Sequence, residues 1–186
     1  MKKSGSGFTI VEILIVIVVI AILAIISIVA YNGMQQRAAN IKTTAALTAW
    51  IKALNHYKVD NGQYPPGWMC LGEDYGYGES GQESSGAQCR MDLNGTGLQS
   101  SVGFNNSMKP YFNNGSAPTP AMITATNGSG TWRRGLSYAY TGGSGNITYV
   151  LATYSGNIVC PSVSGVALTR TSFGDNVVCH YTLEVR

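Results

Sequence analysis

The six residues GFTIVE at positions 7–12 stand directly before an almost unbroken apolar run, ILIVIVVIAILAIISIVA, which extends from Ile13 to Ala30. Of the 18 residues in this run, only Ser27 is polar. At 1.5 Å per residue, the 24 residues from Phe8 to Tyr31 would form a helix of roughly 36 Å, enough to cross a hydrocarbon core of ~30 Å. The sequence therefore predicts a membrane-spanning helix at residues 8–31.

An acidic residue and a basic leader flank the start of this helix. A carboxylate near the centre of a membrane helix costs on the order of 3 kcal/mol, yet Glu12 stands just inside the segment. The leader, residues 1–7, carries Lys2 and Lys3, which by the positive-inside rule keep it in the cytoplasm and direct the remaining chain outward. A cleaved secretory signal fits less well, because its apolar region would be about 7–15 residues long and end at a small-residue cut site.

Together the leader, the Gly7-Phe8 boundary, Glu12 and the apolar run resemble the class III signal peptide of type IV pilins. This resemblance implies a cut after Gly7, N-methylation of the new terminal Phe8, and a helix that first anchors the subunit and later forms a filament core. It also implies that Phe8 and Glu12 act in assembly, the ammonium group of an incoming Phe8 pairing with Glu12 of a seated neighbour. A contact between Glu12 and the Phe8 amine of its own chain is the alternative, and both fit successive assembly steps.

The chain departs from the pilin pattern within this helix. Many pilins have a proline where Val29 stands and a glycine where Ala21 stands. Because both helix breakers are missing, we expect a more continuous first helix, with Gly33 as its nearest weak point. Tyr31 matches an aromatic residue that recurs in the family just beyond the membrane stretch.

The helix is predicted to continue to about Asp60, for a total length of roughly 75 Å. No proline occurs between Gln35 and Asp60, and segment 32–60 is amphipathic. Its apolar stripe recurs at three- and four-residue steps and should pack on a globular head. The stripe consists of Leu47, Trp50, Ile51, Leu54 and Tyr57, while Lys42, Lys52, His56 and Asp60 lie off it. Asn61-Gly62 and then Pro65-Pro66 end the helix.

The remaining chain divides into a loop region and a sheet region. Residues 61–130 hold 13 of the 23 glycines and predict turn-rich chain, with short elements around Leu98–Phe104 and Met108–Phe112. In residues 131–186, Leu136–Thr141 and Ile147–Tyr154 predict a hairpin, and an alternation of period two predicts a strand from Val177 to Val185. The expected architecture is α+β: a long helix packed on an antiparallel sheet of three or four strands.

Four cysteines outside the membrane segment indicate an oxidising compartment. They allow three pairings, of which Cys70 with Cys89 and Cys160 with Cys179 is the simplest, each loop enclosing 18 residues. Such loops would each stabilise the head by about 3 kcal/mol on the chain-entropy model. The second loop would resemble the disulfide-bounded region of many pilin heads. Zinc is disfavoured because no Cys-x-x-Cys spacing occurs and the two histidines are far apart in sequence.

No motif in the chain supports catalysis, a metal or a cofactor. A nucleophile elbow, a phosphate-binding loop and a His-Glu-x-x-His motif are all missing. With 12 basic and 9 acidic side chains, and Lys2 and Lys3 leaving with the leader, the mature balance is 10 − 9 = +1, so no basic field favours nucleic acid. The chain is therefore not expected to be an enzyme.

Three weaker features have less specific interpretations. An acidic stretch could bind calcium, as a corresponding loop does in some pseudopilins, but without regular ligand spacing a solvated loop is favoured. The tripeptide Trp132-Arg133-Arg134 could grip single-stranded DNA, although a strand-end cluster or a subunit contact is favoured. Five Asn-x-Ser/Thr triplets leave glycosylation open. The acidic residues are Glu73, Asp74, Glu79, Glu83 and Asp92, and the triplets begin at Asn94, Asn105, Asn114, Asn127 and Asn146.

The resemblance implies a structural subunit of a type IV pilus that serves adhesion, twitching motility or DNA uptake. Its implied partners are copies of itself, a prepilin peptidase, a pilus platform protein and cytoplasmic assembly and retraction ATPases. It would reside in the inner membrane as a single-pass prepilin and then in an extracellular filament. The alternatives are a pseudopilin of a type II secretion system, which the cysteines and the long head loop disfavour, and an uncleaved, signal-anchored surface binding protein.

Overall fold

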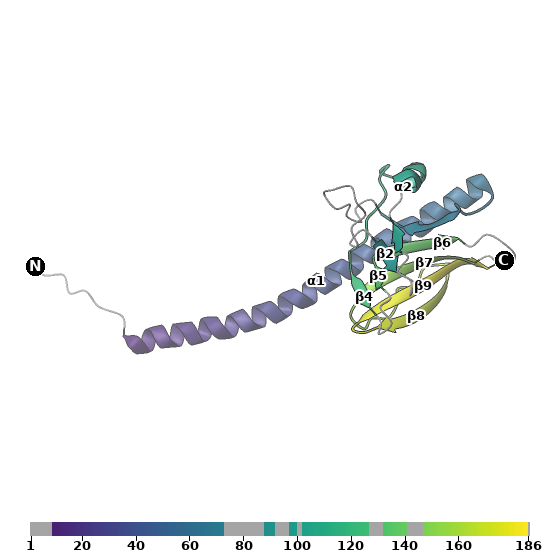
Figure 1. Ribbon diagram of the computed structural model, residues 1–186. Helices are drawn as coiled ribbons and strands as arrows, with labels where there is room; N and C mark the ends of the chain where they lie inside the picture. The colour runs from purple at the N-terminus through teal and green to yellow at the C-terminus, as the bar shows by residue number, and fades with distance from the viewer. Residues whose placement is uncertain are drawn as a thin grey trace, which may run out of the picture. The chain divides into compact units, whose positions relative to one another are not determined.

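The chain forms one long N-terminal helix followed by two antiparallel β-sheets (Figure 1). The computed structural model describes residues 9–72, 88–91, 97–99, 102–126, 132–140 and 147–185. Helix α1 is a single helix of 52 residues, Ile10–Asn61. The backbone divides into two compact units, Met1–Arg37 and Ala38–Arg186, and residues of α1 contribute to both. The predicted α+β class with a long N-terminal helix is confirmed.

The first unit contains the apolar part of α1. The helix passes through Ala21, Val29 and Gly33 without interruption, as expected from the missing helix breakers. Gly33 has nothing within 4 Å of the position that a Cβ would occupy. A glycine in such a place keeps helical geometry at the cost of backbone entropy only.

Gly62 ends α1 by adopting a left-handed backbone conformation. Its φ is +76°, and its N–H donates to the carbonyl of Lys58 at 2.8 Å. The side chain of Asn61 donates to the carbonyl of Tyr57 at 2.9 Å, so a further carbonyl of the last turn is satisfied. The helix therefore stops where the Asn-Gly pair and the following prolines predicted.

In the second unit, the apolar stripe of α1 packs on a sheet of five strands. Leu47, Trp50, Ile51 and Leu54 are buried, and Tyr57 is half-buried. The sheet has the order β1-β6-β7-β9-β8, and every neighbouring pair is antiparallel. Its strands are β1 Gly67–Cys70, β6 Leu136–Tyr140, β7 Ile147–Ser155, β8 Ala167–Phe173 and β9 Asn176–Val185.

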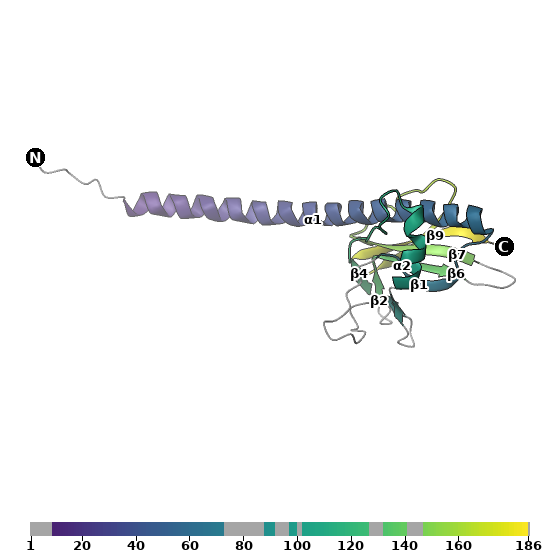
Figure 2. The ribbon, with the colours of Figure 1, turned by 90° about the horizontal axis from the view of Figure 1, so that it is seen from above.

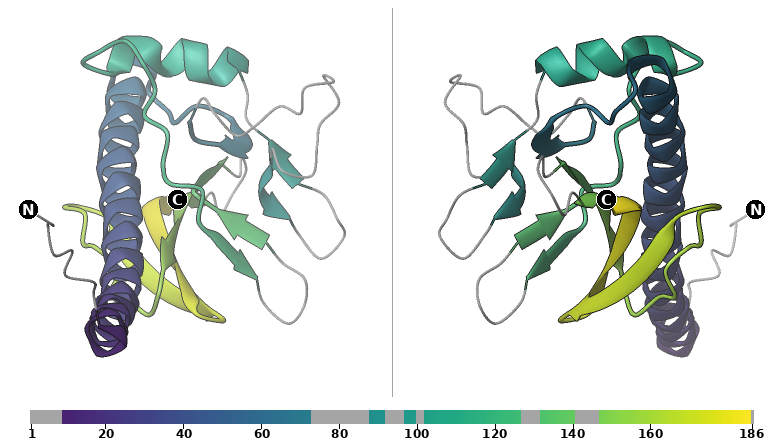
Figure 3. Two further views of the ribbon diagram at one scale, coloured as in Figure 1. Left: turned by 90° about the vertical axis from the view of Figure 1, so that its left-hand side faces the viewer. Right: turned by 90° about the vertical axis from the view of Figure 1, so that its right-hand side faces the viewer.

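The two faces of this main sheet have different partners. Alternate residues of β6, β7 and β9, among them Tyr138, Val150 and Tyr181, share one core with α1. On the opposite face, Leu151 and Val178 pack with Ala125 of a second sheet. Figure 3 shows the C-terminal half of α1 on one side of the main sheet and the smaller sheet on the other, and Figure 2 shows β6, β7 and β9 alongside the same half of α1. The smaller sheet has the order β3-β2-β5-β4, with β2 Gln88–Met91, β3 Gly97–Gln99, β4 Thr124–Thr126 and β5 Trp132–Arg134.

Aromatic side chains close the core beside α1. Helix α2, Val102–Met108, leads into the short 3₁₀ helix η1, Lys109–Tyr111. Phe104 of α2 stacks on Trp50 with ring centroids 6.0 Å apart, and Phe112 meets the same ring edge-on at 4.8 Å. The Trp50 indole N–H donates to the carbonyl of Pro118 at 2.8 Å. A buried indole that has both apolar neighbours and a hydrogen-bond acceptor is well accommodated.

The main sheet is larger than the sequence predicted. Three or four strands were expected, and five are present. Strand β1 comes from the glycine-rich region that predicted loop. Strand β8 is exposed at six of its seven positions. Its sequence, ALTRTSF, does not alternate between apolar and polar residues, so it gave no strand signal. The predicted elements near Leu98–Phe104 and Met108–Phe112 correspond to β3, α2 and η1, and the expected hairpin turn at 142–145 lies outside the described residues.

Two disulfides tie the second unit together. Cys70 at the end of β1 joins Cys89 of β2, with Cα atoms 5.4 Å apart, and thereby links the two sheets. Cys160, between β7 and β8, joins Cys179 of β9, with Cα atoms 5.7 Å apart. This is the simplest of the three pairings that the sequence allowed.

Candidate functional site

The start of α1 is closed by a reciprocal pair of side chains, Thr9 and Glu12. The Thr9 backbone N–H and its hydroxyl both donate to Glu12 Oε2, at 3.0 and 2.9 Å. In return, the Glu12 backbone N–H donates to Thr9 Oγ1 at 3.3 Å. This arrangement is a capping box, in which each side chain satisfies a backbone N–H that has no partner within the helix. Glu12 is therefore held in place by its own chain.

An apolar surface surrounds the helix after this box. Every side chain from Ile10 to Ile28 is exposed. Helix α1 contains an 18-residue window of mean hydropathy 3.6, and none of that window is buried, so α1 is long and apolar enough to cross a membrane. The one hydroxyl within the run, on Ser27, donates to the carbonyl of Leu23 at 2.7 Å. A helix that is apolar on all sides requires lipid or other apolar helices around it.

Glu12 was a predicted site residue, whereas Thr9 was not predicted. The signal was present, because Ser/Thr-x-x-Glu directly before an apolar run is the sequence pattern of a capping box. Gly7 and Phe8 lie outside the described residues, so the expected contact between Glu12 and a Phe8 amine stays a prediction. Glu12 does have a partner in its own chain, and that partner is Thr9.

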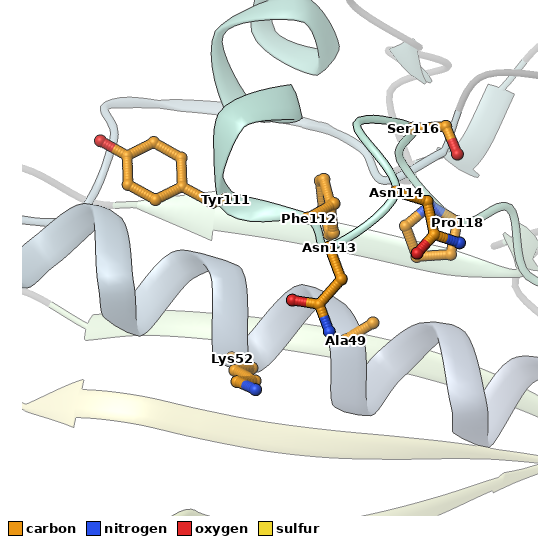
Figure 4. A pocket seen from close by; sticks show the side chains of 8 residues that line it. All are labelled: Ala49, Lys52, Tyr111, Phe112, Asn113, Asn114, Ser116 and Pro118. Carbon is orange, nitrogen blue, oxygen red and sulfur yellow. The ribbon is translucent and has the colours of Figure 1, made fainter.

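A shallow groove of about 220 Å³ lies between α1 and the segment after η1 (Figure 4). Asn113 lies over the helix between Ala49 and Lys52 in this view. The lining holds no carboxylate, histidine or cysteine, so it offers no acid–base pair for catalysis. The residues that line it are Ala49, Lys52, Tyr111, Phe112, Asn113, Asn114, Ser116 and Pro118.

The other candidate positions are not brought together into a site. Within the described ranges, no group of three His, Cys, Asp or Glu side chains could hold a metal ion. His56 lies exposed on α1, whereas His180 on β9 meets the Tyr149 ring edge-on at 4.5 Å. The acidic residues 73, 74, 79, 83 and 92 lie outside the described part of the chain.

The candidate DNA and glycosylation positions are distributed over several elements. Trp132-Arg133-Arg134 forms β5, which pairs with β2 and β4 in the smaller sheet. Asn105 is buried and donates to the carbonyl of Gly72 at 2.8 Å, which leaves Asn114 as the exposed Asn-x-Ser/Thr position among the described residues. Asn94, Asn127 and Asn146 lie outside them.

Comparison with known proteins gives one match. Residues 2–29 match the family model of the prokaryotic N-terminal methylation motif. No curated protein and no solved structure matched the chain. Residues 2–29 thus carry a type IV pilin-like class III signal peptide, which supports a precursor of the pilin or pseudopilin type and points to a structural protein. The motif and the apolar helix fit a membrane-anchored precursor of a surface filament.

Proposed function

We propose that this chain is a structural subunit of a type IV pilus filament. In this proposal a prepilin peptidase cuts the chain between Gly7 and Phe8, and Phe8 is then N-methylated. The retained helix anchors the subunit in the membrane and later packs against the helices of other copies. The observation that carries the proposal is the match of residues 2–29 to the N-terminal methylation motif, which includes both residues of the proposed cut.

The apolar surface of α1 supports polymerisation through this helix. From Ile13 to Ile28, where Ser27 is the one polar residue, the helix presents apolar side chains on all sides. Lipid covers such a surface before assembly, and like helices cover it in a filament. Burial among other copies keeps the apolar surface away from water after the subunit leaves the bilayer. The helix thus has a suitable environment in both states.

Features of the second unit support a location outside the cytoplasm. Its two disulfides require an oxidising compartment, which agrees with the outward direction that the leader lysines favour. In the filament this unit would form the outer surface for attachment, twitching motility or DNA uptake. The partners of this proposal are further copies, the peptidase, a pilus platform protein and assembly and retraction ATPases.

The decisive experiment is the intact mass of the chain in filaments sheared from cells. We expect a chain that begins at N-methylated Phe8 and lacks four cysteine hydrogens. A processed chain that stays in the cell envelope and is missing from sheared filaments would instead support a secretion pseudopilin. A chain that still begins at Met1 and occurs only in membranes would overturn the proposal and identify a signal-anchored surface protein.

A further inference from the structure

The sequence contains five Asn-Gly pairs, and three of them lie among the residues that the structure describes. Asn32-Gly33 lies inside α1, and Asn61-Gly62 stands at its end. Asn114-Gly115 instead lies in a turn after η1. The three pairs have the same covalent chemistry and different backbone surroundings, so the fold decides how readily each one reacts.

The turn at Asn114 is an exposed segment between two buried residues. Residues 113–116 are all exposed, whereas Phe112 and Ala117 on either side are buried. The Gly115 N–H donates to the carbonyl of Phe112 at 3.0 Å, and the φ of Gly115 is +65°. A Cβ at Gly115 would meet nothing within 4 Å. Water therefore reaches both residues of this pair.

We propose that Asn114 is a site of spontaneous deamidation, at which the side-chain amide becomes a carboxylate through a cyclic imide. The backbone nitrogen of Gly115 attacks Cγ of Asn114 and forms a carbon–nitrogen bond. The side-chain nitrogen of Asn114 leaves as ammonia and takes the proton of the Gly115 amide. Water then adds to either carbonyl carbon of the imide and opens the ring, which yields aspartate or isoaspartate. The reaction needs water and no other co-reactant.

Hydrogen bonds oppose the same reaction at the end of α1. The Gly62 N–H, whose nitrogen would attack, donates to the carbonyl of Lys58 at 2.8 Å. The side-chain nitrogen of Asn61 would be the leaving group. It donates to the carbonyl of Tyr57 at 2.9 Å and to the hydroxyl of Tyr111 at 3.2 Å. Ring closure at Asn61 must therefore break three hydrogen bonds.

Fewer bonds oppose ring closure at Asn114. Its side chain has no hydrogen-bond partner in the described part of the chain, so the bond from the Gly115 N–H is the one that must break. With two hydrogen bonds fewer to break, Asn114 should react about five- to hundredfold faster than Asn61. Asn32 should also react slowly, because its glycine lies within the hydrogen-bonded backbone of α1.

Deamidation would change the charge of the groove beside α1. Asn114 and Lys52 both line this groove, and Lys52 is the one charged residue in its lining (Figure 4). The reaction adds a carboxylate to the lining, which then holds one charge of each sign. Because the loss of ammonia is irreversible, this surface of the second unit would change with the age of the folded chain.

The test follows the detergent-solubilised full chain over days at mildly alkaline pH. Digestion at acidic pH, where the reaction is slow, then yields peptides for mass spectrometry. Conversion at Asn32, Asn61 and Asn114 appears as a gain of about 1 Da, the difference between an amide and a carboxyl group. Incubation in heavy-oxygen water labels the new carboxylate, and fragmentation distinguishes isoaspartate from aspartate.

Three controls separate the effect of the fold from other causes. Peptides cut from the chain before incubation carry the same Asn-Gly pairs without the fold. Ser116→Ala removes the Asn-x-Ser triplet at Asn114 and keeps the Asn-Gly pair, so it separates deamidation from glycosylation. Asn114→Gln should suppress the reaction, because the longer side chain must close a larger ring.

In the folded chain we expect Asn114 to convert about five- to hundredfold faster than Asn61, with both isoaspartate and aspartate as products. Ser116→Ala should leave this rate unchanged, and the difference between the pairs should disappear in the peptides cut beforehand. Equal rates at Asn114 and Asn61 in the folded chain, a product without isoaspartate, or a modification that requires Ser116 would overturn the inference. Because the reaction does not depend on the cut at Gly7, none of these results bears on the proposed function.

Discussion

Asn40 holds α1 to the main sheet with both atoms of its side-chain amide. Its Nδ2 donates to the carbonyl of Ser155 at 2.9 Å, and its Oδ1 accepts the Ser155 N–H at the same distance. One turn further on, the Thr44 hydroxyl lies 3.4 Å from the Tyr154 hydroxyl. These contacts bind the end of β7 to the beginning of the helical stripe. At the scale of single residues, the two hydrogen bonds between Asn40 and Ser155, here called the polar clamp, fix where the helix meets the sheet.

Asn40→Ala removes both bonds of this clamp and leaves the Ser155 backbone groups without their side-chain partner in a partly buried place. We expect the free energy of unfolding to fall by about 1–3 kcal/mol. Urea unfolding of the detergent-solubilised chain, followed by tryptophan fluorescence, measures the change. Ile41→Ala is the matched control, since its side chain is 69 % exposed and its loss should cost no more than about 0.5 kcal/mol. Equal midpoints for the two variants would show that the clamp contributes nothing.

At the scale of elements, two glycines have opposite roles, one inside α1 and one just beyond its end. Gly33 lies inside the helix, where a Cβ would meet nothing within 4 Å. Gly62 stands just beyond the helix with φ +76°, and a Cβ there would also meet nothing. Because space is open at both, the backbone conformation alone should decide the effect of adding a methyl group.

Gly33→Ala should stabilise the helix by about 0.5–1 kcal/mol, because alanine loses less backbone entropy than glycine. Gly62→Ala should destabilise the chain by about 1–2 kcal/mol, because the left-handed conformation is strained for a residue with a Cβ. Hydrogen exchange of the amides around residue 33 in micelles measures the first change, and urea unfolding measures the second. Changes of the same sign at both positions would contradict this assignment of roles.

At the scale of the whole molecule, the core contains several buried tyrosines. Burial raises the pKa of Tyr138, Tyr154 and Tyr181. Tyr138 donates to the carbonyl of Pro65 at 2.7 Å, and Tyr181 donates to that of Pro161 at 2.8 Å. These bonds tie the chain after α1 and the chain after β7 to the centre of the sheet. The neutral phenols are therefore part of the folded state.

Stability should fall steeply at alkaline pH for this reason. In the unfolded chain, tyrosine ionises near pH 10, whereas the three buried phenols keep their protons above it. The unfolded state therefore releases protons first, and each tyrosine should lower stability by about 1.4 kcal/mol per pH unit above that pH, with little change below about pH 9. Urea unfolding midpoints at a series of pH values above and below pH 10 measure the slope of stability against pH. Tyr138→Phe should make the fall of stability with pH less steep, and an unchanged slope would show that the Tyr138 phenol does not contribute to it.

The sequence by itself determined the helix. Its apolar run, the uninterrupted course through Ala21 and Val29, the stripe around Trp50 and the stop at Gly62 all follow from local properties: hydropathy, helical period and the conformational range of glycine. The capping box at Thr9 and Glu12 was equally local and readable in the sequence. Strand β9 was also predicted, because its residues alternate over nearly its whole length.

Only the tertiary structure decided which other segments join the sheets. Gly67 of β1 pairs with Tyr140 of β6, which is far away in the sequence. The amino-acid composition of β1 does not predict this pairing. Segment 167–173 is a strand because β9 supplies its hydrogen-bond partners. The pairing runs from Ala167 opposite Thr182 to Phe173 opposite Asn176. Val178 alternates with the residues of β9 that face α1, and it is buried because the second sheet covers its face. The physical reason is that backbone hydrogen bonds between strands are independent of residue type, so pairing depends on which distant segments the fold brings together.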